Sequence, residues 1–110
     1  VNHAADFPGS ASRHALEAAA RWGVDLVREA KARAIKATEI FWRNLGLVFF
    51  QLGRKRAAID TWATYLEQVL QRGGGTWPDG SEGQAAEAVA RVTCEEAQRI
   101  SAAEESRSAI

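Results

Sequence analysis

Apolar residues recur along this chain at steps of three and four positions, the spacing that gathers side chains on one face of an α-helix. Between about residues 13 and 36 the repeating positions are Leu16, Ala20, Gly23, Val27, Ala30 and Ala34. Between about residues 55 and 72 they are Ile59, Trp62, Ala63, Leu66, Val69 and Leu70. Between about residues 82 and 103 they are Ala86, Val89, Thr93, Ala97 and Ile100. No segment alternates apolar and polar residues as a half-buried strand does, so the pattern predicts an all-α protein.

A further segment, from about residue 39 to 52, is apolar on nearly every side. Only Arg43, Asn44 and Gln51 are polar between Ile40 and Leu52. A helix with so few polar positions is surrounded by other elements rather than lying at the surface. The pattern therefore predicts about four helices, with this one packed among the others.

Capping residues and helix breakers mark where these helices begin and end. The hydroxyl of Ser10 or Ser12 can accept a hydrogen bond from free N–H groups of the first helical turn, and Thr38 can cap the next helix. Nothing between residues 13 and 52 strictly forbids one long helix, so one helix and two are both open there. Gly53 is expected to end the second helix in the left-handed conformation.

A glycine-rich stretch, GGGTWPDGSEG, predicts the loop before the last helix. Gly73 closes the preceding helix, and Pro78-Asp79-Gly80 is typical of a turn. Ser81 and Gln84 have the spacing of a capping box. Trp77 in this loop either packs back on the helices or serves as an exposed anchor for a partner.

Length and composition fit one globular domain. The chain has 110 residues, of which 46 % are apolar and 25 % charged, the ordinary range for such a domain. We expect an N-terminal arm at residues 1–9, a single helical domain at residues 10–107 and a frayed tail at residues 108–110. No apolar run approaches the roughly 20 residues of a membrane span, and the first residues lack the basic and apolar regions of a signal peptide. The sequence predicts no membrane span and indicates no compartment.

Charge is balanced overall but not along the chain. Fourteen Lys and Arg match fourteen Asp and Glu, which gives no reason to expect nucleic acid or an anionic membrane as a partner. Residues 1–75 hold eleven basic and seven acidic residues, a net charge of +4, and residues 76–110 hold three and seven, a net charge of −4. Either the acidic segment folds back on the basic one, or one of these faces docks a charged partner.

Three consecutive cations, Arg54, Lys55 and Arg56, fall at the start of a predicted helix. The helix dipole disfavours positive charge there, so a neighbouring anion would stabilise this end. The acidic last helix is the first candidate for that anion, an acidic partner is the second and nucleic acid the third.

The residues that carry chemistry in other proteins are few and scattered here. His3 and His14 have no second metal ligand at helical spacing, and Cys94 is the only cysteine. Its neighbours Glu95 and Glu96 disfavour the thiolate that a nucleophile needs. We therefore expect no catalytic residue, no metal and no cofactor, and a protein that is not an enzyme, with Cys94 inert and half-buried.

The stretch WRNLGLVFFQLGRKRAAIDTW carries a more specific signal. Its key positions are Trp42, Leu45, Gly46, Phe49, Ala58 and Trp62. Their spacing resembles the W-x2-L-G-x2-Y…A-x3-F pattern of the tetratricopeptide repeat, with Phe49 and Trp62 as aromatic replacements for aromatic residues. The resemblance covers about residues 39–72, one repeat. Gly46 and Ala58 are small where two antiparallel helices would cross, and the larger side chains would fill the space around them.

Three features depart from the family pattern. Leu70 stands where proline is usual near the end of the repeat, and Tyr65 stands where a small residue is usual. Neither residues 5–38 nor residues 73–106 repeat the signature, although such a solenoid normally needs about three repeats. The resemblance thus implies one antiparallel hairpin of tetratricopeptide type between two flanking helices that act as caps. A four-helix bundle unrelated to the family is the alternative.

The resemblance also implies a binding surface, because the first helix of each repeat lines the concave face in this family. The implied positions are Ile40, Arg43, Asn44, Leu47, Phe50 and Gln51, with Arg54, Lys55 and Arg56 as an electrostatic rim. Some members hold a partner's terminal carboxylate with a basic residue and an asparagine, but Leu47 stands in place of that asparagine, so no such clamp is expected. Burial of Phe50 and Leu47 would contribute about 1.5–3 kcal/mol each. Either a flanking helix covers them or a partner does.

Together these observations predict a protein–protein interaction module, an adaptor or a small scaffolding subunit. It would take a partner's amphipathic helix or apolar peptide, or a second copy, through that groove. The alternative is a structural subunit of a larger complex with a closed core, which binds through its outer helices and the Trp77 loop. Replacing Phe50 with glutamate distinguishes the two, because it would abolish binding in the first case and unfold the domain in the second.

Overall fold

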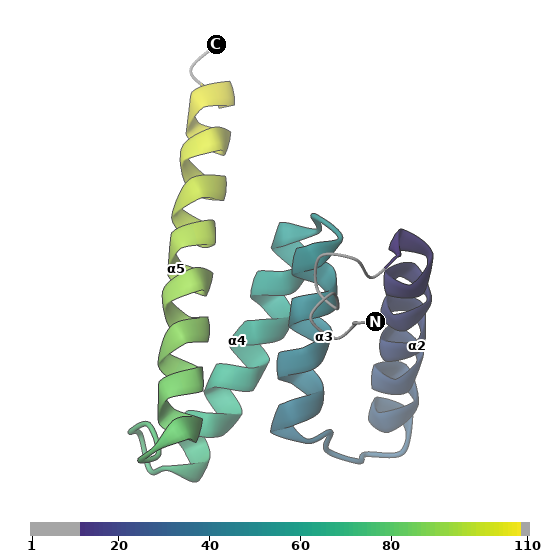
Figure 1. The fold of residues 1–110 in the computed structure, drawn as a ribbon, viewed down its shortest axis with the longest axis vertical. Coiled ribbons are helices and arrows are strands. Elements are labelled where there is room, and N and C mark those ends of the chain that lie inside the picture. The colour runs from purple at the N-terminus through teal and green to yellow at the C-terminus, as the bar shows by residue number, and fades with distance from the viewer. Residues whose placement is uncertain (1–11, 109–110) are drawn as a thin grey trace, which may run out of the picture.

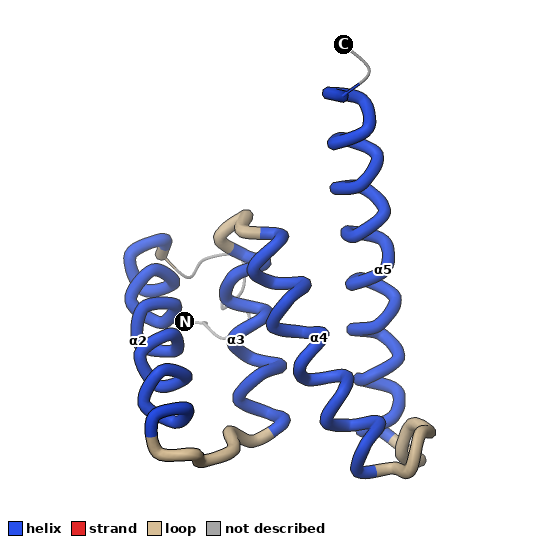
Figure 2. Tube along the Cα trace, turned by 180° about the vertical axis from the view of Figure 1, so that it is seen from behind, coloured by secondary structure: helices blue, strands red, loops and turns tan. Residues whose placement is uncertain are grey.

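The computed structural model describes residues 12–108, and the arm predicted at residues 1–9 lies outside this range. The helices within it are α2 (Arg13–Ala32), α3 (Glu39–Gln51), α4 (Lys55–Arg72) and α5 (Ser81–Ser108). Residues 12–108 contain no strand, so the prediction of an all-α protein with about four helices is confirmed. The helices lie side by side in chain order and each runs antiparallel to the one before it (Figure 1). The view from behind in Figure 2 shows the same order.

The region between residues 13 and 52 forms two helices rather than one. Ala34 adopts a left-handed φ of 56°, and the N–H of Ile35 donates to the carbonyl of Ala30 at 2.8 Å. This turn ends α2 at Ala32, before the predicted end at residue 36, and leaves Ala34 exposed rather than on the inward stripe. Thr38 then caps α3 by accepting from the N–H of Phe41 at 3.3 Å. The turn allows α3 to fold back against α2.

Two of the other predicted helix ends agree with the structure. The Ser12 hydroxyl accepts from the N–H of Ala15 at 3.0 Å and caps α2. Gly53 has the left-handed conformation, with a φ of 80°. Gly73 follows the last residue of α4, but with a φ of −89°, and the left-handed residue after it is Gly74.

The last helix is longer than predicted at both ends. The N–H of Gln84 donates to the carbonyl of Gly80 at 3.1 Å rather than to the Ser81 hydroxyl, so the helix starts at Ser81 without the predicted capping box. At its other end α5 continues to Ser108, past the predicted end at residue 103, because these last residues include neither glycine nor proline. Of the tail predicted at residues 108–110, Ser108 is the last residue of α5, and residues 109 and 110 lie outside the described range. The final turns of α5 extend beyond the other three helices (Figure 1).

The core centres on the crossing of α3 and α4. Ala58 is fully buried, and a Cβ added at Gly46 would overlap the indole ring of Trp62. Leu45 and Phe49 are buried beside this crossing. The small residues thus stand where the two helices approach most closely, and the large ones surround them, as the sequence pattern predicts.

Helix α2 adds to the same cluster through one side. Leu16 and Ala20 are buried, and a Cβ at Gly23 would overlap the side chain of Leu45. Gly23 costs stability in a helix interior, and the space left by its missing side chain is filled by Leu45 of α3.

A second apolar cluster joins α4 to α5 at the other end of the hairpin. Its buried members are Tyr65, Val69 and Ala86, and Trp77 packs against them. Trp77 therefore packs back on the helices, the first of the two alternatives for this residue. The inward face of α4 is also rotated slightly from the predicted one, because Tyr65 is buried whereas Ala63 is exposed. On α5 the predicted inward residue Ala97 is exposed and its neighbour Glu96 is buried beside Arg99.

Candidate functional site

The residues that the family resemblance assigns to a groove on α3 do not form one continuous surface. Ile40, Asn44 and Leu47 follow one another at i, i+4 and i+7 along the solvent side of α3. Ile40 is 60 % exposed and Leu47 38 % exposed. Arg43 and Phe50 are half-buried and lie on the side of α3 that faces α4.

Phe50 is covered from within the chain. Its ring centroid lies 5.4 Å from that of Trp62, and the Lys55 Nζ atom lies 3.5 Å from the centre of the Phe50 ring. Both covering residues belong to α4, not to either flanking helix considered in the sequence analysis. Gln51 is half-buried beyond it, and its Oε1 has no hydrogen-bond partner among the residues that the structure describes.

The three cations at the start of α4 are each engaged by a neighbour. Arg54 donates to Glu17 of α2 at 2.6 Å, and Arg56 pairs with Glu104 of α5. Lys55 lies over the Phe50 ring, a cation–π contact. The acidic last helix thus supplies one of the anions predicted for this helix end, and α2 supplies the other. The pair between Arg56 and Glu104 also fits the alternative in which the acidic C-terminal segment folds back on the basic part.

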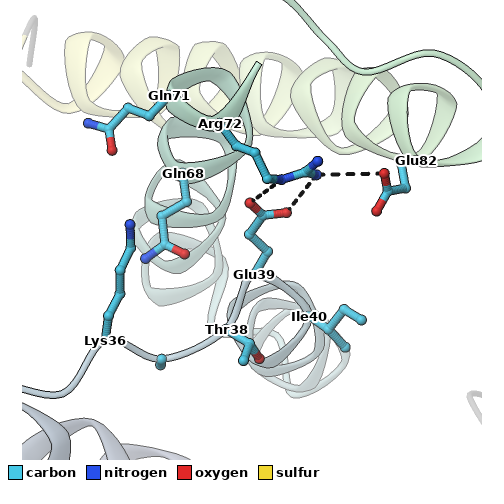
Figure 3. A pocket seen from close by; sticks show the side chains of 9 residues that line it. Lys36, Thr38, Glu39, Ile40, Gln68, Gln71, Arg72 and Glu82 are labelled. Atoms are coloured by element: carbon cyan, nitrogen blue, oxygen red, sulfur yellow. Dashed lines mark hydrogen bonds and ion pairs between the residues drawn. The ribbon is translucent and has the colours of Figure 1, made fainter. Parts of the chain in front are cut away.

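An ionic cluster joins α3, α4 and α5 at the opposite end of the hairpin (Figure 3). Arg72 donates to both carboxylate oxygens of Glu39, at 2.8 and 3.0 Å, and its guanidinium lies 3.7 Å from Glu82. The hydrogen bond from Arg72 lowers the pKa of Glu39 below its ordinary value, although partial burial opposes the shift and the charges of Arg72 and Lys36 reinforce it. The same hydrogen bond, with the charge of Glu39, raises the pKa of Arg72. The ion pairs of Arg72 with Glu39 and Glu82 thus link three helices, and we call these three residues the Arg72 clamp.

Two hollows border this clamp. The smaller, about 190 Å³, is lined by Glu39, Ile40, Arg43, Tyr65, Val69, Arg72 and Glu82. The larger and more open one, about 760 Å³, shares Glu39, Ile40, Arg72 and Glu82 with it (Figure 3). Its other lining residues are Lys36, Ala37, Thr38, Gln68 and Gln71. Ile40 and Arg43 are therefore brought together here, away from Phe50 and the cations of α4. Because Arg72 already pairs with two carboxylates, the clamp keeps little charge for a ligand.

A third hollow is an apolar groove between α2 and α3, with a volume of about 280 Å³. It is lined by Ala19, Trp22, Gly23, Leu26, Phe41, Asn44, Leu45 and Val48, none of which is ionisable. We call it the α2/α3 groove. At its edge Trp22 is 68 % exposed, the largest exposed fraction among the big apolar side chains of residues 12–108. Asn44 is the only residue predicted to bind a partner that lines this groove.

Trp22 and Leu26 are not among the predicted binding residues, although the chain carries a signal for them. Ala15, Ala19, Trp22 and Leu26 fall at i, i+4, i+7 and i+11, a second apolar stripe on the helix whose other stripe packs on α3. Packing within the chain buries only one of these two stripes. Here the second stripe borders the α2/α3 groove.

Other candidate chemistry is dispersed over the structure. Cys94 is exposed on α5 rather than half-buried as predicted. His14 is exposed in the first turn of α2, and His3 lies outside the described residues. Within residues 12–108 no three side chains of His, Cys, Asp or Glu gather into a group that would hold a metal ion. In the same range no helix combines the length and the apolar character needed to cross a membrane.

Comparison with known proteins adds no relative to this picture. Neither a protein-family model, nor a curated protein, nor a solved structure matches the chain. Functional inference therefore depends on the surfaces just described.

Proposed function

We propose that the chain is a protein–protein interaction module that takes an amphipathic helix or apolar peptide in the α2/α3 groove. The observation that carries this proposal is the exposed indole of Trp22 at the edge of a groove without ionisable residues. Tryptophan is among the residues that contribute most to binding when a partner buries it. Apolar side chains gathered at one place on a surface are typical of interaction sites.

The exposed face of α3 extends this apolar surface. Ile40 and Leu47 lie beside the groove on the same helix as Phe41 and Val48. Asn44 stands between them and offers one amide to a partner's backbone. This combination of an apolar wall with an isolated polar side chain is what a groove for a helix or peptide requires. The resemblance to tetratricopeptide repeats favours the same class of function.

The alternative function is a structural subunit with a closed hairpin core. It is supported by Phe50, which α4 covers, and by Trp77, which packs on the second cluster. The proposed function uses the α2/α3 groove together with Asn44 and the exposed side of α3. The structural subunit would instead bind through its outer helices and the Trp77 loop.

The experiment that tests the proposed function compares two matched baits. Trp22→Glu places a charge at the groove edge, whereas Ile35→Glu removes an apolar side chain that is 58 % exposed and does not line the groove. Both are expected to fold, since neither side chain is buried. We expect proteins recovered with the wild-type chain, from cells that express it, to be recovered with Ile35→Glu and lost with Trp22→Glu. Equal recovery with both variants would contradict the proposed function.

A further inference from the structure

We infer that the chain has a second binding site, a basic hollow on the other side of α2, which takes an acidic segment of a protein partner. The site shares no lining residue with the α2/α3 groove. The inference therefore adds to the proposed function, and its test is independent of that function. The argument depends on the charges of the hollow, on its place at the start of α4 and on its apolar floor.

Positive charge gathers around this hollow, which has a volume of about 260 Å³ and lies between α2 and the turn from α3 to α4. Its charged lining residues are Arg21, Asp25, Arg28 and Arg54. Three arginines against one aspartate give the lining a net charge of +2 on a chain whose overall charge is zero. We call this site the basic hollow. Its charge is complementary to that of an acidic ligand.

Ion pairs within the chain leave this excess of positive charge in place. Arg21 is exposed and has no ion-pair partner within residues 12–108. Arg28 lies 3.4 Å from Asp25, and both side chains are largely exposed, so water and salt weaken their attraction. Arg54 is the arginine with a close pair, a hydrogen bond of 2.6 Å to Glu17. A carboxylate that enters the hollow thus meets at least one arginine without a partner.

The start of α4 adds to the positive potential of the basic hollow. Arg54 is the N-cap residue of α4, and its side chain makes no capping hydrogen bond. The first turn of α4 also has no acidic residue. Because the N-terminal end of a helix carries a partial positive charge, a carboxylate at this place is stabilised by the helix dipole as well as by the arginines.

The spacing of the arginines selects a chain of anionic groups rather than a single phosphate. Arg21 and Arg28 are seven positions apart on α2, or about 10 Å along the helix axis. Arg54 reaches the hollow from the other side, at the start of α4. Each guanidinium group favours a carboxylate of its own, held by two parallel hydrogen bonds. Acidic side chains spaced along a peptide meet this requirement.

The floor of the basic hollow is apolar. Val24 is 39 % exposed, whereas Ala20 and Phe49, which also line the hollow, are buried. An apolar side chain between acidic ones would cover Val24 and remove it from water. Since Phe49 is buried, its ring is not free to stack on a nucleotide base. The floor therefore favours an acidic peptide over a nucleic acid.

The test is the binding of a labelled peptide, four glutamates on each side of one leucine, to the full chain, measured by fluorescence anisotropy. We expect saturable binding that weakens as salt is added, and no binding of the same peptide with glutamine in place of glutamate. An exposed ion pair contributes about two- to fivefold in affinity. Arg21→Glu combined with Arg28→Glu is therefore expected to weaken binding more than tenfold, because each change replaces an attraction by a repulsion.

Arg91→Glu combined with Arg107→Glu is the matched control. These two changes alter the net charge equally, at exposed arginines of α5. We expect this variant to bind the acidic peptide within about twofold of the wild type, because salt screens charges that lie far from the peptide. Circular dichroism establishes that each variant is folded. If the double variant in the hollow does not fold, Arg21→Gln alone should weaken binding by about two- to fivefold.

Other results would overturn the inference. An acidic peptide that does not bind, or that both double variants weaken equally, would show that the basic hollow does not select acidic segments. Displacement of the peptide by an equal concentration of inorganic phosphate would assign the hollow to a single phosphate group. Tighter binding of single-stranded oligothymidylate than of the peptide, lost in the Arg21→Glu and Arg28→Glu variant, would assign the hollow to nucleic acid.

Discussion

The indole nitrogen of Trp62 donates a hydrogen bond to the backbone carbonyl of Arg43, 3.0 Å away, across the crossing of α3 and α4. This bond satisfies the one polar atom of a ring that is otherwise surrounded by apolar groups. It also fixes the ring in the position where it covers Gly46 and contacts Phe50. The angle between the two central helices therefore depends on one side chain and the small residue opposite it.

Replacing Gly46 with alanine is expected to destabilise the protein despite the better helix propensity of alanine. The new methyl group would overlap the Trp62 ring, which its hydrogen bond holds in place. Overpacking of this kind costs about 1–3 kcal/mol, and the propensity gain of about 1 kcal/mol offsets part of it. We expect a net loss of up to about 2 kcal/mol in the free energy of unfolding, measured by urea denaturation followed by circular dichroism.

Gly23→Ala is the matched control for this change. A methyl group at Gly23 would meet the far end of the Leu45 side chain, which can turn aside, rather than a fixed ring. The propensity gain of about 1 kcal/mol then compensates for the crowding, and stability is expected to change little. Equal losses in the two variants would show that the Trp62 ring is not fixed as described.

The second prediction concerns Phe50, whose environment distinguishes a free groove from a closed core. Because Phe50 packs on Trp62 and under Lys55, Phe50→Ala is expected to lower the free energy of unfolding by about 1–3 kcal/mol. Leu47→Ala, on the exposed face of the same helix, is expected to cost less than about 1 kcal/mol. Thermal melts of both variants measure the difference. Similar melting temperatures for the two variants would show that α4 does not cover Phe50 and that its side chain is free at the surface.

The sequence could predict the helices because their signals are local. Amphipathic spacing, Ser12, Thr38 and Gly53 act within one or two turns of chain, and each performs the predicted role. The crossing of α3 and α4 was also predictable, since the small residues Gly46 and Ala58 are needed where two backbones approach. Membership in the tetratricopeptide family stays a prediction, because the hairpin geometry alone does not separate it from another helical bundle.

The surfaces could not be predicted in the same way, because they depend on how far each helix is rotated. Phe50 and Leu47 are three positions apart on α3, yet one is covered by α4 and the other faces solvent. Trp22 is exposed only because no described element packs over its side of α2. The identity of the covering element is a tertiary property that the periodicity of a single helix does not contain.

The third prediction is a pH dependence that arises from the clamp of Arg72 with Glu39. The pKa of Glu39 is lowered in the folded protein, so its contribution to stability is present above its ordinary value of 4.5 and is lost as the pH falls through the lowered pKa. Glu39→Gln should therefore reduce the urea midpoint slightly at neutral pH. The difference from wild type should shrink below pH 4.5.

The control for this titration is Glu67→Gln, which alters an exposed glutamate of α4 with no ion-pair partner among residues 12–108. Its effect on the urea midpoint is expected to be small at every pH. If Glu39→Gln and Glu67→Gln gave the same pH profile, the clamp would contribute nothing measurable to folding.

The last prediction concerns the turn that leads into α5. A Cβ added at Gly83 would overlap the backbone carbonyl of Pro78, and a backbone atom cannot move aside as a side chain does. Gly83→Ala should therefore displace the loop, release Trp77 from the cluster around Tyr65 and destabilise the protein by about 2 kcal/mol or more. Gln84→Ala, at the next and exposed position, is expected to have little effect. Unfolding curves measure the loss, and iodide quenching of tryptophan fluorescence should rise in Gly83→Ala alone. Unchanged quenching together with full stability would mean that the loop is free to shift and that α5 is not held by this contact.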